Sequence, residues 1–391
     1  MFDIEKARRD TPGCDNVLHF NNAGAALMPK IVRDTLVHHV DREMMIGGYE
    51  AAAQAYDQLE RVYESTGKLV GCGSDEIALV ESATQAWVNA FYAIPFERGD
   101  KILTGRAEYA ANYIAFLQIA KRRGVEIKVI PVDAFGQVSV DVLREMIDNR
   151  VKLIAITHIP TNGGLINPAE QIGNVARDAG ILYLLDACQT VGQKPIAVSE
   201  IGCDILSGTS RKYLRGPRGM GFLYVKKQLI PDLEPATLDL HSATWVSRNH
   251  YEIRADARRF EKWESSVASR LAFGAAVDYA LDWGMDVIWK RIQHLSIALR
   301  HRLTQLPACT LQDLGDQKCG IVTFTIDGYS QREIQEQLTL QKINVSISDR
   351  ASTLLDMDAR GLRDIIRASI HYYNTEQEIN QFCDALKSIV G

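Results

Sequence analysis

The sequence has no apolar run of 18 residues, and its first ten residues, MFDIEKARRD, contain no apolar core of a signal peptide. A run of about 18 apolar residues is typical of a membrane-spanning helix, so we expect no membrane attachment. Basic residues do not predominate, because 44 Lys and Arg stand against 49 Asp and Glu, for a net charge of −5. This balance provides no positive field for nucleic acid, and we expect no nucleic-acid partner.

Cysteine patterns are missing as well. The seven cysteines are odd in number, irregularly spaced and never arranged as C-x-x-C. We therefore expect neither a disulfide framework nor a metal site, and we expect the reducing cytoplasm as the location. The motifs G-x-G-x-x-G and G-x-x-x-x-G-K-[ST] are also absent. Dinucleotide-binding and P-loop proteins thus lose their main sequence signatures.

The 391 residues, 46% hydrophobic and 24% charged, suffice for two domains. In the middle of the chain, strand candidates alternate with helical patterns, which predicts an α/β fold with a mostly parallel, doubly wound sheet. A helical segment from Arg270 to Leu306 then leads to a smaller α+β part. We divide the chain into an N-terminal arm (1–28), a large domain (29–270) and a connector helix with a small domain (271–391). The predicted strands of the large domain are Ile77–Val80, Lys101–Leu103, Ile127–Ile130, Leu153–Ile156, Ile181–Leu185, Asp204–Leu206 and Gly221–Val225.

Two strand ends carry the strongest chemical pattern. One apolar run stops at Asp186, and the next turns through Ser-Gly-Thr-Ser to Arg211 and Lys212. Ligands of open parallel sheets bind outside the carboxyl ends of the strands, so both side chains are expected to face one crevice. Pyridoxal phosphate requires a carboxylate that keeps its pyridine nitrogen protonated and a lysine that forms an imine. Taken alone, each residue also has an ordinary interpretation, as a helix-capping Asp or a solvated Lys.

The other strand ends present polar and aromatic side chains. Ser82 and Thr84 open a helix, and this turn suits either an anion site or a simple helix cap. Tyr109 follows the next strand and can lie flat on a cofactor ring or merely pack. A ring oxygen can be met by Thr161 or Asn162, or by Gln189, three residues after Asp186.

Two further segments suit a substrate carboxylate. Asn22, Ala23 and Gly24 form a small-residue turn that can present an amide and bare N–H groups, or can simply precede the first long helix. Arg367 stands inside an apolar strand, where a charge is costly unless it is paired. It either pairs with an internal acid or binds a carboxylate in bidentate fashion.

With these residues assembled, nearly the whole chain resembles the class V aminotransferase family of fold type I pyridoxal phosphate enzymes, which includes the cysteine desulfurases. The strongest pieces are Asp186-Ala187-Cys188-Gln189 and Ser207-Gly208-Thr209-Ser210-Arg211-Lys212 followed by Gly216-Pro217. The resemblance implies a seven-stranded large domain, a small C-terminal domain and a homodimer with shared active sites. It also implies that the segment 259–265 is lent by the partner subunit.

The resemblance assigns roles to individual residues. Lys212 would hold the cofactor in a Schiff base, Asp186 would pair with the ring nitrogen and Gln189 would meet the ring hydroxyl. Tyr109 stands where desulfurases have a His stacked on the ring, and Thr161 or Asn162 near their ring-contacting Asn. Arg367, with Asn22, Ala23 and Gly24, would bind the amino-acid substrate. The phosphate would be held by Ala83, Thr84, Thr209 and Arg211.

The chain departs from the desulfurase pattern in a way that bears on function. Desulfurases carry a nucleophilic Cys on a loop before the Arg, but the segment Ser346–Thr353 here contains none. Persulfide chemistry needs a thiolate at that place. We therefore expect a carbon–sulfur lyase that releases a thiol or sulfenate, pyruvate and ammonia from a cysteine S-conjugate or its sulfoxide, nearest to the hercynylcysteine sulfoxide lyase and cystine C–S lyase branch. An aminotransferase or isopenicillin N epimerase-like enzyme is the alternative, with cysteine desulfurase behind it.

Overall fold

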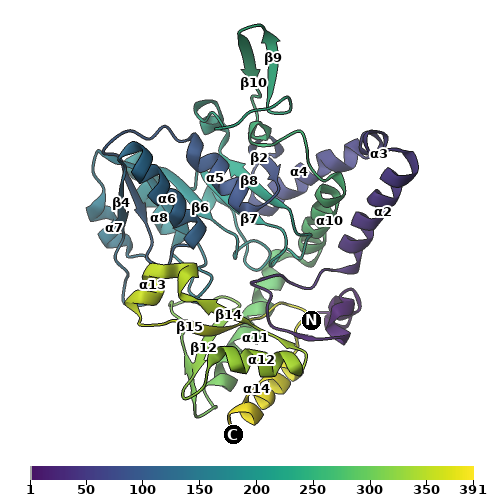
Figure 1. Cartoon of the computed structure of the whole chain (residues 1–391), viewed down its shortest axis with the longest axis vertical. Helices are drawn as coiled ribbons and strands as arrows, with labels where there is room; N and C mark the ends of the chain where they lie inside the picture. The colour runs from purple at the N-terminus through teal and green to yellow at the C-terminus, as the bar shows by residue number, and fades with distance from the viewer. Residues whose placement is uncertain (1) are drawn as a thin grey trace.

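The computed structural model describes residues 2–391 and has a large domain above a smaller C-terminal one in the view of Figure 1. The large domain is built on a seven-stranded sheet in the order β2-β8-β7-β6-β5-β3-β4. Within this sheet β8 alone is antiparallel to its neighbours, so the predicted mostly parallel sheet is confirmed. The strands are β2 Ile77–Val80, β3 Lys101–Thr104, β4 Glu126–Val129, β5 Val151–Thr157, β6 Leu182–Asp186, β7 Ile205–Thr209 and β8 Gly221–Val225.

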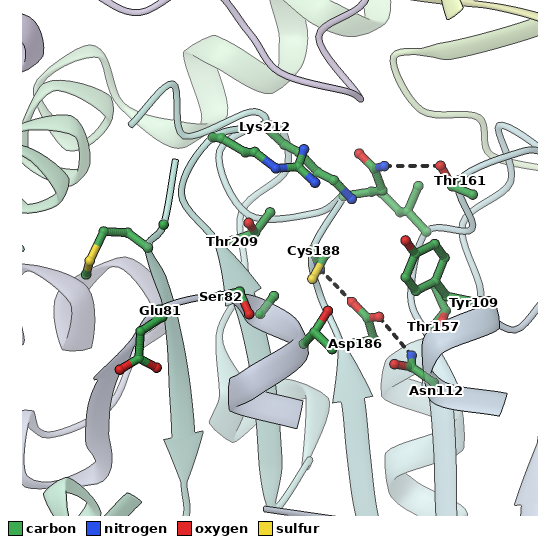
Figure 2. Close-up of a pocket in the computed structure, with 17 residues that line it drawn as sticks. Glu81, Ser82, Tyr109, Asn112, Thr157, Thr161, Asp186, Cys188, Thr209 and Lys212 are labelled. Carbon is green, nitrogen blue, oxygen red and sulfur yellow. Dashed lines mark hydrogen bonds between the residues drawn. The ribbon is translucent and has the colours of Figure 1, made fainter. Parts of the chain in front are cut away.

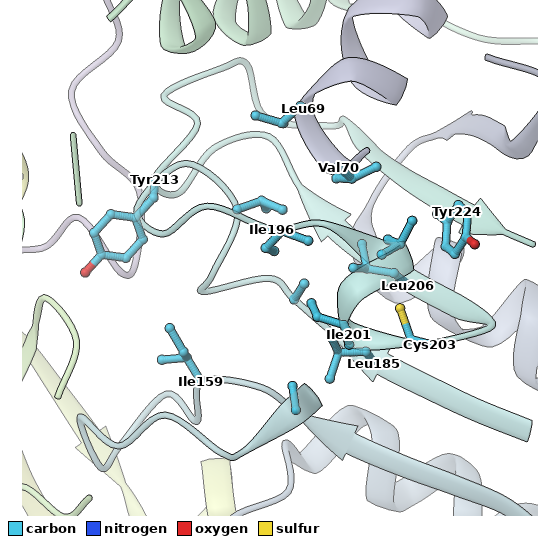
Figure 3. Close-up of a cluster of buried hydrophobic side chains, with 14 of the residues drawn as sticks. Leu69, Val70, Ile159, Leu185, Ile196, Ile201, Cys203, Leu206, Tyr213 and Tyr224 are labelled. Carbon is cyan, nitrogen blue, oxygen red and sulfur yellow. The ribbon is translucent and has the colours of Figure 1, made fainter. Parts of the chain in front are cut away.

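Both faces of this sheet are buried, which is why its central strands are apolar runs instead of alternating patterns. Successive residues of β6 point to opposite faces, so Leu184 packs in one hydrophobic cluster and Leu185 in the other. Figure 3 shows part of the second cluster, where Leu185 and Leu206 meet Ile201 and Cys203. The two covered faces leave the ends of the strands as the place for a ligand.

Helices cover each face. On one side lie α5 (Ala83–Ala93) and α6 (Ala110–Arg123), which contribute Trp87 and Phe116 to the core. On the other side lie α4 (Tyr56–Val70), α7 (Val140–Met146), α8 (Ala169–Ala179), α9 (Val198–Ile201) and α10 (Val267–Trp283). Ahead of α4 come α2 (Lys30–Ile46) and α3 (Gly48–Gln54). These two helices are separated at Gly47, whose φ of 96° favours glycine.

The C-terminal domain follows α11 (Met285–Leu303), which continues the connector after its break at Gly284. Its sheet has the order β11-β12-β15-β14 and is antiparallel. A separate hydrophobic cluster fills the space between this sheet and its helices. The elements are β11 Cys309–Leu311, β12 Ile321–Ile326, α12 Gln331–Leu340, β13 Ile343–Asn344, β14 Ser346–Asp349, α13 Leu354–Ala359, β15 Asp364–Ser369 and α14 Glu376–Val390.

The N-terminal arm joins the C-terminal domain. After α1 (Ile4–Arg9), strand β1 (Leu18–His19) pairs in parallel with β13, and Asn21 forms a bridge with Ser369. Arg8 forms an ion pair of 2.6 Å with Glu378 in α14. The first residues of the chain are therefore held by segments that come near its end, and they run from there toward the large domain.

A hairpin of β9 (Ala243–Ser247) and β10 (His250–Ile253) projects at the top of Figure 1. The sequence analysis did not predict it, because both of its faces are exposed and no strand of the core pairs with it. No helix among residues 2–391 is long and apolar enough to cross a membrane.

Candidate active site

A cavity lies at the edge of the large sheet where its parallel strands end (Figure 2). The strands β5, β6 and β7 end at this edge with Thr157, Asp186 and Thr209, and the antiparallel β8 begins there opposite Thr209. Turns that follow parallel strands thus meet in one place, as the sequence argument requires. The lining residues that the sequence predicted are Ala83, Thr84, Tyr109, Thr161, Asp186, Gln189, Thr209, Arg211 and Lys212.

Lys212 and Asp186 line the same cavity, with Lys212 at its top and Asp186 below in Figure 2. Burial lowers the pKa of Lys212, and the nearby Arg211 lowers it further, against a smaller opposing effect of Cys188 and Asp186. A lysine with a lowered pKa has a larger neutral fraction, which is the form that attacks an aldehyde. Asp186 accepts hydrogen bonds at 2.9 Å from the Cys188 N–H and from the Asn112 amide.

The start of α5 forms an anion cradle. The Ser82 side chain caps the helix by accepting the Gln85 N–H at 3.0 Å, so the cap that the sequence suggested is present. The N–H groups of Ala83 and Thr84, earlier in the same turn, border the cavity at the positive end of the helix dipole. Strand β8 passes directly beneath, since a Cβ on Gly221 would lie 2.5 Å from the Ala83 nitrogen.

Thr209 and Arg211 border the same cavity as this cradle. The Arg211 guanidinium donates to the Gly24 carbonyl, and its pKa is lowered by burial and by the neighbouring Arg218. A hydroxyl, a guanidinium and a helix N-terminus are the donors that a phosphate group needs.

Tyr109 lies beside Asp186 in Figure 2 and is 40% exposed. A ring that merely packed in the core would be buried, so its position favours contact with a ligand in the cavity. The amide of Gln189 donates to the Ala23 carbonyl at 3.1 Å and to the Thr161 hydroxyl at 3.4 Å. These two bonds fix the orientation of the Gln189 side chain in the cavity wall. They also link the N-terminal arm to the turn after β5.

Arg367 on β15 lies behind Thr161. Its Nη1 donates to the Thr161 hydroxyl at 2.5 Å and its Nη2 to the Asn21 side chain at 3.5 Å. It is 7% exposed, burial lowers its pKa to about 10, and no ion pair joins it to a carboxylate among residues 2–391. Of the two alternatives that the sequence left open, internal pairing is excluded by this geometry. A guanidinium buried without an acid fits an incoming carboxylate.

Two predicted contacts are placed elsewhere by the structure. The Asn22 side chain is fully buried and donates to the Ser369 carbonyl at 2.7 Å, while its oxygen accepts from the Tyr373 hydroxyl. Its polar atoms are used inside the protein, so the prediction that Asn22 contacts the substrate is wrong for the side chain. Ala23 and Gly24 offer their carbonyls to Gln189 and Arg211, so they position cavity residues.

Asn162 is the second such case. Its amide nitrogen donates to the Thr353 hydroxyl at 3.0 Å and to the Asp349 carbonyl at 3.5 Å. Thr161 lines the cavity and Asn162 does not, although the Asn162 Oδ1 is also buried without a partner among residues 2–391. The bonds of Asn162 instead join the end of β14 and the following 3₁₀ turn, Arg350–Thr353, to the turn after β5.

The segment 259–265 also differs from its prediction. Arg259, Phe260 and Glu261 are buried in their own chain, and Glu261 accepts the Leu79 N–H at 2.7 Å and the Tyr63 hydroxyl at 2.9 Å. These three residues are therefore not available to a partner subunit. Trp263, which is 50% exposed, lies in the part that remains accessible.

Sequence reasoning missed two residues beside Asp186. Asn112, in the first turn of α6, donates to Asp186, and Glu108 accepts hydrogen bonds from Asn112 and Thr157. The spacing of four residues between Glu108 and Asn112 at a helix start was the available signal. Nothing in the sequence indicated that this helix turn would face the end of β6.

Unpartnered atoms show that the site fits a cofactor and an amino acid. The Gln189 Oε1 and the Arg367 Nε are buried without a hydrogen-bond partner among residues 2–391. Buried polar groups are normally satisfied, so each is explained by a ligand group with the complementary role. A ring hydroxyl can donate to Gln189, and a carboxylate can accept from Arg367. No cluster of metal-ligating side chains occurs in the described chain, and the donor set is that of an organic phosphate.

Comparison with known proteins agrees with this geometry. The family model Aminotransferase class-V matches residues 18–382. A cysteine desulfurase of Synechococcus elongatus is 26% identical over 401 residues, which is 99% of this chain and 64% of that protein.

Two solved structures share the fold. The apo cysteine desulfurase of Thermococcus onnurineus NA1 is 23% identical, with a TM-score of 0.92 over 100% of this chain and 98% of the other. The cystine C–S lyase C-DES, in complex with cysteine persulfide, is 22% identical, with a TM-score of 0.87 over 96% and 99%. The predicted fold type I architecture is confirmed. The chain is a pyridoxal phosphate-dependent enzyme and belongs to the class V aminotransferase family.

Proposed function

We propose that this enzyme is a carbon–sulfur lyase that acts on a cysteine S-conjugate or its sulfoxide. The products are a thiol or sulfenate, pyruvate and ammonia. The observation that carries the proposal is the shared cavity of Lys212 and Asp186, with Arg367 behind it and no cysteine in the segment 346–353, whose Asp349 and Thr353 contact Asn162.

The residues supply each requirement of this elimination. When bound, pyridoxal phosphate draws electrons away from the α-carbon of an attached amino acid. Arg367 would grip the substrate carboxylate, and the hydrogen bond that it donates to the Thr161 hydroxyl fixes the plane of its guanidinium. Lys212 would hold the cofactor and would take the proton from the substrate α-carbon, and Asp186 would keep the ring nitrogen protonated. The carbon–sulfur bond would break with its electron pair on the leaving sulfur, so the protein needs no nucleophile. Water would then hydrolyse the remaining three-carbon enamine to pyruvate and ammonia.

Cysteine desulfurase is the second candidate, because the Synechococcus relative carries that name. That reaction needs a thiolate at the substrate sulfur. Cys188 is the one cysteine among the residues that line the cavity, and burial raises its pKa well above the ordinary value. It also lies at the Asp186 side of the cavity in Figure 2. A protonated thiol at that end supports elimination over persulfide transfer.

A panel of cysteine S-conjugates and sulfoxides, assayed with the purified enzyme, tests the proposal. We expect pyruvate and ammonia in equal amounts, without a keto-acid acceptor and without added thiol. Alanine with sulfide would favour the desulfurase. Pyruvate formed only when a keto acid is present would favour the aminotransferase, and racemised substrate alone the epimerase-like alternative. Absence of pyruvate from every conjugate contradicts the lyase. Lys212→Ala serves as the inactive control.

We further propose a homodimer in the cytoplasm. Exposed apolar side chains support the dimer, since Met44 and Met45 on α2 are 75% and 71% exposed and Trp263 is 50% exposed. Met44 and Met45 are adjacent on α2, and neighbouring exposed large apolar side chains commonly mark an interface. All seven cysteines are free, which suits a reducing compartment. Sedimentation equilibrium of wild type and of Met44→Glu tests the dimer, which the added charge should weaken.

A further inference from the structure

One amide joins two buried acids behind the cavity. The Asn112 nitrogen donates to the Glu108 Oε1 at 2.8 Å and to the Asp186 Oδ2 at 2.9 Å. Figure 2 shows Asn112 reaching Asp186 from the side away from Lys212. All three side chains are buried, with exposed fractions of 3% to 5%. Turning the amide over would put its oxygen against both carboxylates, so its orientation is fixed.

Glu108 receives an unusual number of donors. The Thr104 hydroxyl, the Tyr109 N–H and the Thr157 N–H each donate at 3.1 Å, and the Thr157 hydroxyl donates at 2.5 Å. These donors come from β3, β5 and the start of α6, and all of them are neutral. No ion pair with a cation forms at Glu108 among residues 2–391. Glu108 is therefore a buried carboxylate whose negative charge is not balanced by a cation of the described residues.

The titratable groups around Glu108 are acids, so none of them brings a positive charge. Burial raises its pKa to about 7, and the adjacent Asp186 adds to the rise. Tyr183 on β6 is the other titratable group that faces it, and Glu108 contributes to the raised pKa of that phenol. Two neighbouring carboxylates without a cation stabilise a positively charged group that binds beside them. A protonated pyridine nitrogen beside Asp186 is such a charge.

We propose that Glu108 is a positioning residue for the cofactor's ring nitrogen, acting through Asn112 and Asp186. Asn112 transmits the role by fixing the Asp186 carboxylate in the plane that meets the ring. Glu108 adds a second negative charge behind Asp186, which favours the protonated ring nitrogen and so strengthens the electron sink. This inference rests on the proposed function, specifically on the placement of the ring nitrogen against Asp186.

The test measures ring protonation directly in the holoenzyme. Wild type and Glu108→Gln are loaded with pyridoxal phosphate labelled with ¹⁵N in the ring, and the nitrogen chemical shift is followed from pH 6 to pH 10. We expect the ring-nitrogen pKa to fall by about one to two units in Glu108→Gln, because a nearby negative charge is lost. The visible absorption band should shift its titration in the same direction. Glu108→Asp, which keeps the charge, should recover part of the change.

Controls separate this role from a merely structural one. Glu145→Gln removes an exposed glutamate of α7 and should leave the nitrogen shift unchanged. Asn112→Ala keeps both acids but removes the bridge, and it provides the test if Glu108→Gln does not fold; we expect a smaller fall of the same sign. An unchanged ring-nitrogen pKa in whichever of these two variants folds overturns the inference, even if activity falls. A wild-type enzyme without any labelled cofactor signal would instead contradict the proposed function.

Discussion

The Arg367 guanidinium donates to the Thr161 hydroxyl at 2.5 Å, across the boundary between the C-terminal sheet and the turn after β5. This bond joins the residue proposed to hold the substrate carboxylate to a residue that lines the cofactor cavity. It leaves Nε of Arg367 unpartnered, so the guanidinium has a fixed plane and a free donor. Substrate binding therefore depends on how the two domains meet.

Removing the guanidinium should weaken substrate binding more than cofactor binding. We expect Arg367→Ala to raise KM by about 10²-fold, the effect of truncating one partner of a buried charged contact. The visible cofactor band should persist. Arg363→Ala, which removes an exposed arginine just before β15, is the control and should change neither. Steady-state kinetics with an intact spectrum provide the measurement, and an unchanged KM in Arg367→Ala would rule out the assigned contact.

Thr161→Val should produce a weaker form of the same defect. The substitution keeps the size of the side chain and deletes the hydroxyl that accepts from Arg367 and from Gln189. Loss of one hydrogen bond to a charged group should raise KM by about tenfold. Thr161→Ser, which retains the hydroxyl, should restore a KM near that of wild type. Equal values for the Val and Ser variants would show that the hydroxyl does not orient Arg367.

Lys212→Ala should abolish both catalysis and the covalent link. Without the amine no Schiff base with the protein forms, and the proton acceptor for the α-carbon is lost as well. We expect activity to fall by about 10³-fold or more. The band that borohydride removes in wild type should be missing. A Lys212→Ala variant that retained a borohydride-sensitive band would place the link on another lysine.

The pH dependence of the stability of the cofactor-free enzyme should reflect the titration of Glu108. Its pKa rises from 4.5 to about 7 on folding, chiefly because of burial. Between these two values the folded state binds more protons than the unfolded state, so this group lowers the stability of the fold as the pH rises from about 4.5 to 7. Glu108→Gln should flatten that part of the curve. Melting temperatures across this range measure it, and parallel curves for the two proteins would contradict the raised pKa.

Asn22 should matter for stability. Asn22→Ala leaves the Ser369 carbonyl and the Tyr373 hydroxyl without this buried partner. The Tyr373 hydroxyl still accepts from the Leu27 N–H at 3.1 Å, so we expect the free energy of unfolding to fall by about 2 kcal/mol, the cost of the hydrogen bonds that are lost. Asn16→Ala, an exposed asparagine of the same arm, should have little effect. Urea unfolding compares them. A stable Asn22→Ala with a raised KM would reinstate the substrate contact that the sequence suggested.

The sequence predicted the seven strands and the cavity residues that directly follow them, because both depend on local order along the chain. A buried run ending in Asp186, and another followed by Lys212, have one simple arrangement in a parallel sheet. Arg367 was recognisable because a charge within an apolar strand demands an explanation.

The remaining features depend on distant partners. Asn22 was misassigned because Ser369 and Tyr373, which occupy its side chain, come about 350 residues later. Asn112 was missed because its contact with Asp186 follows from how α6 lies against β6, 74 residues apart. The β9–β10 hairpin has no buried face, so it lacks the alternation of apolar and polar residues that marks a strand.

The pairing of β1 with β13 sets an order of events during biosynthesis. Its two halves are separated by some three hundred intervening amino acids, so β1 has no strand to join until residues 343–344 have been synthesised. Until then the carbonyls of Ala23 and Gly24 cannot settle against Gln189 and Arg211. The newly made polypeptide therefore gains a complete vitamin B6 pocket only after this late pairing, and a variant that breaks the pairing of β1 with β13 should lose that pocket before the central sheet unfolds.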